Sequence, residues 1–579
     1  MIRKRALLIA FIAACGHAQP PAPVVPATTT AIAPGLASTD VDRMLAAEWQ
    51  KAGVTPAARA DDAQFLRRLW VDVLGSLPTP DDVRKFTADV SPDKRAKMVD
   101  KLLADPAWVR HWTDYWDDEL MGRARAANVD RGAFRGWLRA RLVKNTPWND
   151  IVSGLVTANG LQSSGGNRNP FATKDEESGV NGAVNYLLHF DNPNDAAGSV
   201  SRVFLGVQIQ CAQCHDHKTE KWKQDDFRKF ASCFTRVKID VLDKGNTMGV
   251  KRVDLEDAQR PYPPFARNPD LAPVVASHPT ALDGTDLAKD PSARKALASW
   301  MTSKDNPWFA KEMVNRLWGH FLGRGFVNPV DDLRPGNPPE ASELWEAMAK
   351  DFADHGWDQK RLMRTIVLSQ AYQLSSGPDP KLWSRFRVMP MGPGELVGAL
   401  LAATDVDDLA IRATRADPEE VRQKLLAAYG FVFDVDEEFD KPAYEGTITQ
   451  ALVMLNGRVT AAGSSAIPGT TLVSMLRTGA SDDQIIEELY LRTLSRKPTV
   501  EELGKTVQYI ADAKVKPPPP RVTIPPPPRI DRKGNEKPDA KKPDPAQRML
   551  DARPLDARTA ALEDIFWALL NSSEFFFNH

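Results

Sequence analysis

Apolar side chains recur at the three- and four-residue spacing of an amphipathic helix through almost the whole sequence after residue 38. Clear examples are Phe65, Leu66, Leu69, Trp70 and Val73, and later Met98, Val99, Leu102 and Leu103. Alternating strand patterns are scarce: residues 205–210 alternate weakly, and residues 250–255 fit one strand of a small hairpin. The spacing therefore predicts a mainly α fold of two helical domains, with long irregular connections and few short strands.

Capping side chains that precede a proline mark several helix starts, because proline at the first helical position gives up no hydrogen bond. These pairs are Ser91-Pro92, Asp105-Pro106 and Asn306-Pro307. The acidic pairs Asp225-Asp226 and Asp331-Asp332 are also interpreted as helix caps. Aromatic residues at helical spacing predict core packing rather than a cofactor face: Trp108, Trp112, Tyr115 and Trp116.

Changes in composition divide the chain into segments. A proline-rich stretch over residues 256–292 marks the boundary between the two helical domains. Eleven prolines over residues 516–545 predict an extended insert, after which helical spacing resumes. The predicted order is a signal peptide (1–15), a Pro/Ala/Thr-rich tether (16–38), an N-terminal helical domain (39–255), the irregular connection (256–292) and a C-terminal helical domain (293–579) that contains the insert.

The first residues predict export. Three basic residues precede a run of nine apolar residues. This run has the length of the apolar region of a secretory signal and is too short to span a bilayer. The run ends at Cys15 and resembles the bacterial lipobox, so Cys15 is the predicted lipidation site. An ordinary cleaved signal with a stray cysteine is the alternative. Gly16 resembles the default sorting to the outer membrane, which predicts an exported, periplasm-facing or cell-surface lipoprotein held in the membrane by its lipid alone.

Composition and motifs exclude several classes of function. The chain carries 75 Lys and Arg against 76 Asp and Glu, a formal net charge of −1, which gives no bulk electrostatic reason to bind nucleic acid. Its four cysteines are too few for a disulfide scaffold in 579 residues. The sequence contains no P-loop, Rossmann glycine pattern, Gly-x-Ser-x-Gly elbow or His-Glu-x-x-His motif, which disfavours an ordinary hydrolase, kinase or dehydrogenase.

One short cluster carries chemistry. The string Cys211-Ala212-Gln213-Cys214-His215 has the c-type haem attachment pattern, in which two thiols bond the vinyl groups and the histidine binds the iron. His215 is then the proximal ligand. Met248, in a glycine-flanked loop, is the candidate for the sixth ligand, His189 is the alternative, and a five-coordinate iron is a third arrangement.

The same residues support two other interpretations. Cys211 and Cys214 could form a tight disulfide in an oxidising compartment. Alternatively, His217 and Cys233 complete a four-ligand zinc set with the two cysteines, which would be closed and therefore structural, with Asp216 outside the ligand shell. Cys233 is a buried free thiol in the haem and disulfide interpretations.

Several longer strings together resemble known domains. The strings Arg67–Asp72, Leu77–Pro80, Val203–Val207 and Cys211–His217 resemble a domain of unknown function that is abundant in planctomycetes and is often labelled planctomycete cytochrome c. The strings Asn306–Ala310, Val314–Trp318, Asp331–Pro335, Leu368–Tyr372 and Leu569–Phe575 resemble the second domain of unknown function that normally follows it. The likeness covers nearly everything from about residue 40 onward, apart from the proline-rich insert.

The resemblance implies an exported protein and carries Cys211, Cys214 and His215 over as haem ligands. His217 belongs to the family string but has no role in an ordinary cytochrome c, which keeps non-haem metal binding open. Cys233 departs from the family pattern, which weakens the zinc set. The expected function is that of a membrane-anchored c-type haem protein that transfers electrons to unidentified redox or envelope proteins and is not itself a catalyst. The alternative is a non-redox envelope scaffold, which could assist in glycan handling and in which the cysteines hold zinc or a disulfide.

Overall fold

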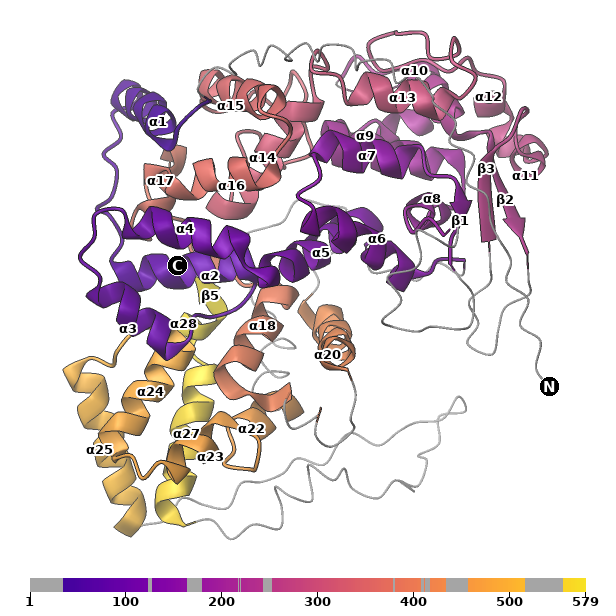
Figure 1. The fold of residues 1–579 in the computed structure, drawn as a ribbon. Coiled ribbons are helices and arrows are strands. Elements are labelled where there is room, and N and C mark those ends of the chain that lie inside the picture. Colours follow the sequence, from indigo (N-terminus) through magenta and orange to yellow (C-terminus); the bar gives the residue numbers. More distant parts are fainter. Residues whose placement is uncertain are drawn as a thin grey trace, which may run out of the picture. The chain divides into compact units, whose positions relative to one another are not determined.

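The computed structural model describes residues 35–122, 128–163, 180–216, 218, 220–242, 253–378, 381–407, 411, 417–433, 457–515 and 556–579. The predicted signal peptide, most of the tether and the proline-rich insert lie outside these residues, as do Cys15, His217 and Met248. From Leu36 to His579 the chain forms one compact unit (Figure 1).

The described chain is mainly helical, as the apolar spacing predicts. The first part contains α1 (Ser38–Ala52), α2 (Asp62–Leu74), α3 (Pro80–Ala88), α4 (Lys94–Ala104), α5 (Pro106–Met121), α6 (Arg131–Val143), α7 (Trp148–Val156), α8 (Val184–Leu188), α9 (Pro193–Leu205), η1 (Gln210–Gln213), α10 (Gln224–Ala231) and η2 (Ser232–Phe234). The connection contains α11 (Pro263–Ala266), η3 (Pro269–Leu271) and α12 (Ala272–Val275).

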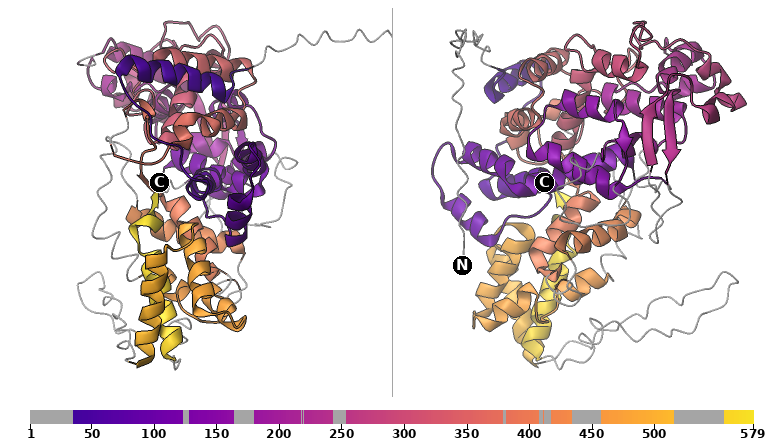
Figure 2. Two further views of the ribbon diagram at one scale, coloured as in Figure 1. Left: turned by 90° about the vertical axis from the view of Figure 1, so that its left-hand side faces the viewer. Right: turned by 45° about the vertical axis from the view of Figure 1, so that its right-hand side comes forward.

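The later part adds α13 (Ala293–Met301), α14 (Phe309–Leu322), α15 (Ser342–Asp354), α16 (Gln359–Leu368), α17 (Gln370–Gln373), η4 (Lys381–Trp383), α18 (Pro393–Thr404), α20 (Pro418–Phe433), α22 (Arg458–Gly463), α23 (Thr471–Arg477), α24 (Asp482–Leu494), α25 (Val500–Val515), α27 (Ala557–Leu570) and α28 (Ser573–Phe576). Helices α24, α25 and α27 lie side by side at one end of this unit (Figures 1 and 2). Their apolar faces pack with α18 into a cluster that also takes in Val71 and Leu77 near α2.

Strands are few and short. An antiparallel sheet has the order β1 (Gly160–Leu161), β3 (Val253–Asp257), β2 (Val237–Val241), and a second pairs β4 (Met389–Pro390) with β5 (Phe577–Asn578). The strand expected near residues 250–255 is present as β3, whereas the weak alternation over residues 205–210 does not correspond to a strand. There, Leu205 ends α9, and the buried Val207 and Ile209 alternate with exposed residues without a partner strand.

The predicted helix starts differ in accuracy. Asp105 caps α5 by accepting the backbone N–H of Ala107 at 2.8 Å. Asn306 accepts the N–H groups of Trp308 and Phe309 at 3.0 Å, although α14 begins only at Phe309. The start expected at Ser91 is misplaced by two residues, because α4 begins at Lys94 after an Asp93 whose side chain makes no capping bond.

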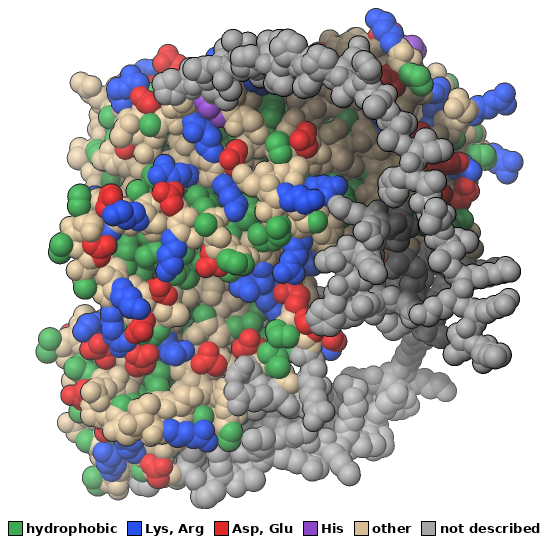
Figure 3. All heavy atoms as spheres, in the orientation of Figure 1, with side chains coloured by type: hydrophobic (Ala, Val, Ile, Leu, Met, Phe, Trp, Pro, Cys, Tyr) green, Lys and Arg blue, Asp and Glu red, His purple; other side chains and the backbone are tan. Residues whose placement is uncertain are grey.

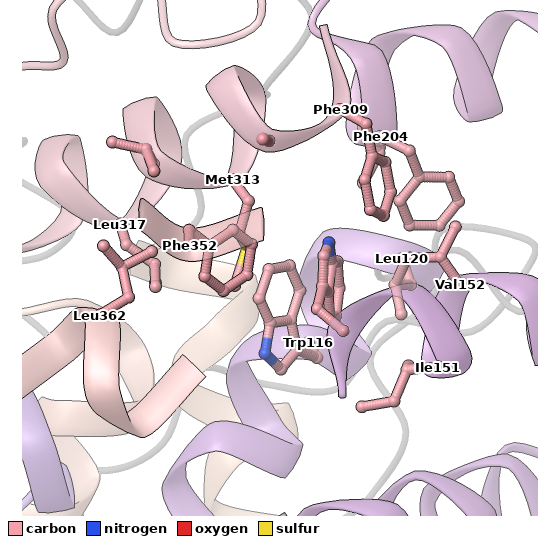
Figure 4. Packing of buried hydrophobic residues seen from close by; sticks show 14 of the residues in the cluster. Trp116, Leu120, Ile151, Val152, Phe204, Phe309, Met313, Leu317, Phe352 and Leu362 are labelled. Carbon is pink, nitrogen blue, oxygen red and sulfur yellow. The ribbon is translucent and has the colours of Figure 1, made fainter. Parts of the chain in front are cut away.

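One apolar core runs through both predicted domains. The predicted aromatic stripe of α5 lies at its centre: Trp108, Trp112 and Trp116 are fully buried. The Trp116 ring lies 4.2 Å from that of Trp148, centroid to centroid, and its indole N–H donates to Gln359 on α16 at 3.0 Å. Figure 4 shows residues from before and after the connection packed together: Trp116, Leu120, Ile151, Val152, Phe204, Phe309, Met313, Leu317, Phe352 and Leu362.

Charges are mixed on the molecular surface. On the face drawn in Figure 3, basic and acidic side chains are interspersed, with no large area of one sign. Among the described residues, no helix is both long and apolar enough to cross a membrane.

A buried arginine on α13 links the connecting segment to the helices that precede and follow it. Arg294, at the start of α13, has a side chain that is only 1% exposed. It forms an ion pair with Asp257 at the end of β3 (2.7 Å). It also donates to the carbonyl of Val156, the last residue of α7 (3.1 Å), and to that of Ala158 (2.9 Å). A buried charge is tolerated only when it is paired and hydrogen-bonded, so this arginine fixes three segments together.

Replacing Arg294 should therefore destabilise the fold. We expect Arg294→Met to lower the free energy of unfolding by about 3 kcal/mol, because it removes the charged partner of Asp257 and the donor to Asn159 and two carbonyls. Arg43→Met is the control: Arg43 pairs with Asp40 at the surface, and its loss should cost less than about 0.5 kcal/mol. Urea denaturation followed by circular dichroism measures both. A loss below about 1 kcal/mol for Arg294→Met would contradict this assignment.

A buried histidine makes the fold acid-sensitive. His111 on α5 is 3% exposed, and burial together with the neighbouring His320 lowers its pKa to about 3. In the unfolded chain His111 takes up a proton near pH 6.5, whereas in the native protein it does so only near pH 3. The contribution of His111 to stability is therefore fully present above pH 6.5 and is lost as the pH falls toward 3. The imidazole is therefore neutral in the native protein.

We expect His111 to cost the native state about 3 kcal/mol of stability between about pH 6.5 and about pH 4. The His111→Gln variant should lose less stability over this interval, with a slope smaller by up to one proton. Urea denaturation across the interval gives both slopes. Equal slopes in the two proteins would show that His111 is not the acid-sensitive group.

Candidate functional site

The cysteine motif lies on a short turn that is oriented by the burial of one residue, Ala212. Helix α9 ends at Leu205 and is capped by Gly206, whose φ of 66° is left-handed, and η1 follows at Gln210. Ala212 of η1 is fully buried, whereas Cys211, Cys214 and His215 are exposed. Because residues three apart share a face of a 3₁₀ turn, the two thiols lie on the same outward side. We refer to Cys211–His215 as the thiol turn.

Neighbouring helices hold the backbone of the thiol turn. The side-chain amide of Gln224, at the start of α10, donates to the carbonyls of Gln213 and Cys214, both at 3.0 Å. The backbone N–H of Gln224 also donates, to the Asp216 carboxylate at 2.9 Å. On the other side, a Cβ at Gly198 of α9 would lie 2.4 Å from the Gln210 amide, so the glycine allows η1 to pack closely. The turn is therefore fixed by α9 and α10.

His215 is exposed but not free to rotate. Its Nδ1 lies 2.8 Å from the carbonyl oxygen of Asp216. A carbonyl can only accept, so this contact assigns the proton of a neutral ring to Nδ1 and leaves the Nε2 lone pair available to a ligand. The residue has the tautomer that an Nε2 metal ligand requires.

The three described cysteines fall into two environments. Cys211 and Cys214 are exposed free thiols, with no bond between them. Cys233, in η2, is 2% exposed and belongs to the apolar core, and burial raises the pKa of its thiol to about 12. A metal-binding cysteine must lose its proton, which this site opposes. Among the residues that the structure covers, no three His, Cys, Asp or Glu side chains could hold a metal ion together.

One of the three remaining predicted ligands, His189, lies within the described residues. Met248 and His217 lie outside the described residues. His189 follows α8, where its ring makes an edge contact with Phe190 at 5.4 Å between centroids. Burial, with a smaller contribution from Arg131, lowers the pKa of His189, which suits a neutral imidazole.

Sequence reasoning missed the second side of the site. Residues Asp331–Arg334, which we call the 331–334 loop, contact the chain on both sides of the thiol turn. Asp331 accepts hydrogen bonds from Arg202 (2.9 Å) and Gln208 (3.1 Å), and the N–H of Leu333 donates to the carbonyl of Gly206 at 2.7 Å. Asp331 is therefore not the helix cap that was predicted. Its partners lie more than 120 residues earlier, which no local pattern could indicate.

A buried charged cluster supports this contact. Arg316 on α14, 5% exposed, lies between Glu312 (2.7 Å) and Glu119 (2.6 Å). Burial raises the pKa of Glu312, while Asp331, although largely buried, has its pKa lowered by Arg316 and Arg202. A Cβ at Gly206 would lie 2.3 Å from the Glu312 carboxylate, so the glycine is needed both for its left-handed φ and for this close approach.

Two cavities in the described part of the chain have linings that do not include the thiol turn. The larger of the two that we describe has a volume of about 290 Å³ and is lined by Arg236, Ala276, Ser277, His278, Pro279, Ala288, Asp290 and Ala293. The smaller, about 10 Å³, lies beside Asp351 and His355. Neither includes a residue of the thiol turn in its lining.

Comparison with known proteins identifies two domains. Residues 40–239 match the family model described as a protein of unknown function (DUF1549, PSCyt2), and residues 293–427 match that of a second protein of unknown function (DUF1553, PSD1). The chain matches these two models in that order, with the thiol turn in the first matched region and the 331–334 loop in the second. No curated protein and no solved structure matches it.

The two cysteine environments predict different reactivities. We expect iodoacetamide to modify Cys211 and Cys214 of the reduced native protein rapidly, and Cys233 at least tenfold more slowly, because its thiol is buried and protonated. In urea all three should react. Peptide mass spectrometry over a time course measures each site. Native labelling of Cys233 at the rate of Cys211 would contradict its place in the core.

Proposed function

We propose that this chain is an exported, membrane-anchored c-type haem protein with an electron-transfer role. The observation that carries the proposal is the arrangement of the thiol turn: two free thiols share the exposed side of one turn, and the histidine beside them keeps Nε2 available. Thioether attachment requires accessible thiols spaced in this way, with an adjacent histidine for the iron.

The donor set fits a c-type haem at its attachment points. Cys211 and Cys214 would hold the macrocycle covalently, and His215 would be the proximal ligand. When bound, the haem would supply one-electron chemistry at its iron. The residues of this chain bind and orient it: Gln224 fixes the backbone at Cys214, and the carbonyl of Asp216 fixes the tautomer of His215. Met248 is the proposed sixth ligand, with His189 as the alternative.

The cellular context is part of the same proposal. Covalent haem attachment is completed outside the cytoplasm, so it agrees with an export signal that ends at a lipidated Cys15. The protein would face the periplasm or the cell surface as an outer-membrane lipoprotein, with redox or envelope proteins as partners. The near-zero net charge, and the interspersed charges on the face drawn in Figure 3, give no electrostatic reason to propose a nucleic-acid partner.

One observation favours a second candidate, a non-redox envelope scaffold in which the cysteines hold a structural zinc ion or a disulfide. A porphyrin needs apolar surface around it, and neither described cavity includes the thiol turn in its lining. The zinc version cannot use Cys233 without deprotonating a thiol in the core. Cys211, Cys214 and His217 would then be the protein ligands.

Haem staining of the denatured protein separates the two candidates. The chain is expressed with and without a cytochrome maturation system, and only covalently bound haem remains with the polypeptide after denaturation. We expect staining of the matured protein and none of the Cys211→Ala/Cys214→Ala variant, while Cys233→Ala should stain like the parent chain.

The opposite results define the alternative. Unstained matured protein that contains stoichiometric zinc and no iron by elemental analysis would replace the haem proposal with the scaffold. Staining of the double variant would show that haem is held elsewhere. Loss of staining in Cys233→Ala, with folding preserved, would mean that the third cysteine is part of the site.

A further inference from the structure

The 331–334 loop makes two contacts with the chain, one before the thiol turn in the sequence and one after it. The first is made to Gln208, three residues before Cys211, and the second to Glu220, six residues after Cys214. Both ends of the segment that carries the turn are thus bound to one loop of the other domain. Fixing the ends of a short loop restricts every conformation between them.

The contact before the turn is polar and is centred on a largely buried carboxylate. The Asp331 carboxylate, 13% exposed, accepts from the Gln208 amide (3.1 Å) and the Arg202 guanidinium (2.9 Å). The backbone bond from Leu333 to Gly206 adds a third link at 2.7 Å. These groups fix where the chain leaves α9 and therefore where η1 begins.

The contact after the turn is an ion pair. Arg334 Nη1 lies 3.4 Å from the Glu220 carboxylate, whose side chain is only 6% exposed. Asp332 accepts from Arg334 Nε at 2.8 Å and orients the guanidinium. A Cβ at Gly336 would lie 2.9 Å from the Glu220 oxygen, so the following glycine leaves room for the acid to reach this loop.

We propose that the 331–334 loop positions the thiol turn, and that its contacts with Gln208 and Glu220 are energetically coupled to the chemical state of Cys211 and Cys214. Arg334 and Asp331 are positioning residues, since they act through the segment that carries the thiols. The inference rests on the proposed function only in taking the thiol turn as the working site. Coupling is reciprocal: if the contact shifts the state of the thiols, the state of the thiols must shift the contact.

The first test measures the equilibrium between the dithiol and the disulfide. In a glutathione buffer, one oxidised glutathione is reduced to two glutathione molecules as the two thiols become a disulfide. We expect Arg334→Gln to change this equilibrium constant at least threefold in a chain that remains folded. The equilibrium constant of Arg334→Lys should lie between those of the parent chain and Arg334→Gln. The charge-swapped variant Glu220→Arg/Arg334→Glu should restore the parent value.

Arg324→Gln is the matched control. Arg324 pairs with Glu340 at 2.6 Å and has a similar exposure, 30% against 36% for Arg334, in the same domain. It makes no contact with the segment from Gln208 to Glu220 in the described structure, so it should leave the equilibrium constant within 1.5-fold of the parent, a spread of about 0.2 kcal/mol.

The second test looks for the reciprocal effect by hydrogen exchange and mass spectrometry. Exchange in peptides covering residues 328–337 should differ at least twofold between the dithiol and disulfide forms, and exchange in residues 207–216 should rise in Arg334→Gln. An unchanged equilibrium constant in Arg334→Gln, or unchanged exchange over residues 328–337, would overturn the proposal. Both tests use protein made without haem maturation. Their outcome therefore does not depend on whether the matured protein stains for haem.

Discussion

The aromatic face of α5 is the constraint on which the rest of the structure depends. Trp108, Trp112 and Trp116 are fully buried, and Trp116 contacts Trp148 on one side and donates to Gln359, far along the chain, on the other. Three tryptophans bury a large apolar area on one helix, which is enough to hold elements from both family domains against it. The two domains therefore share one core, although their sequences match separate family models.

This shared core explains why the thiol turn has a fixed position although it lies on the surface. Helix α9 packs on α14, and α14 carries the buried Arg316, which lies among Glu312, Glu119 and Asp331. The thiol turn begins where α9 ends, so its entry point is set by the core rather than by the loop itself. Exposed chemistry supported by rigid elements is the usual arrangement of a binding site.

The sequence allowed the fold class and the aromatic core to be predicted, because helical spacing and burial of Trp116 and its neighbours are local properties. It also placed Cys211, Cys214 and His215 together, because three residues of separation suffice for one turn. It could not locate the partners of Asp331, since Arg202 and Gln208 are distant in sequence. The weak alternation over residues 205–210 does not produce a strand, because burial alternates there without a neighbouring strand among the described residues. The two-domain division stays a prediction.

The central claim is that Cys211 and Cys214 form thioether bonds to one haem, and mass spectrometry of the peptide that contains them tests it most directly. The protein would be purified from a host with a complete cytochrome maturation system and digested under acidic conditions. The account predicts one peptide that carries both cysteines and the mass of a single haem. The same peptide with both thiols free, or joined to each other, would contradict it.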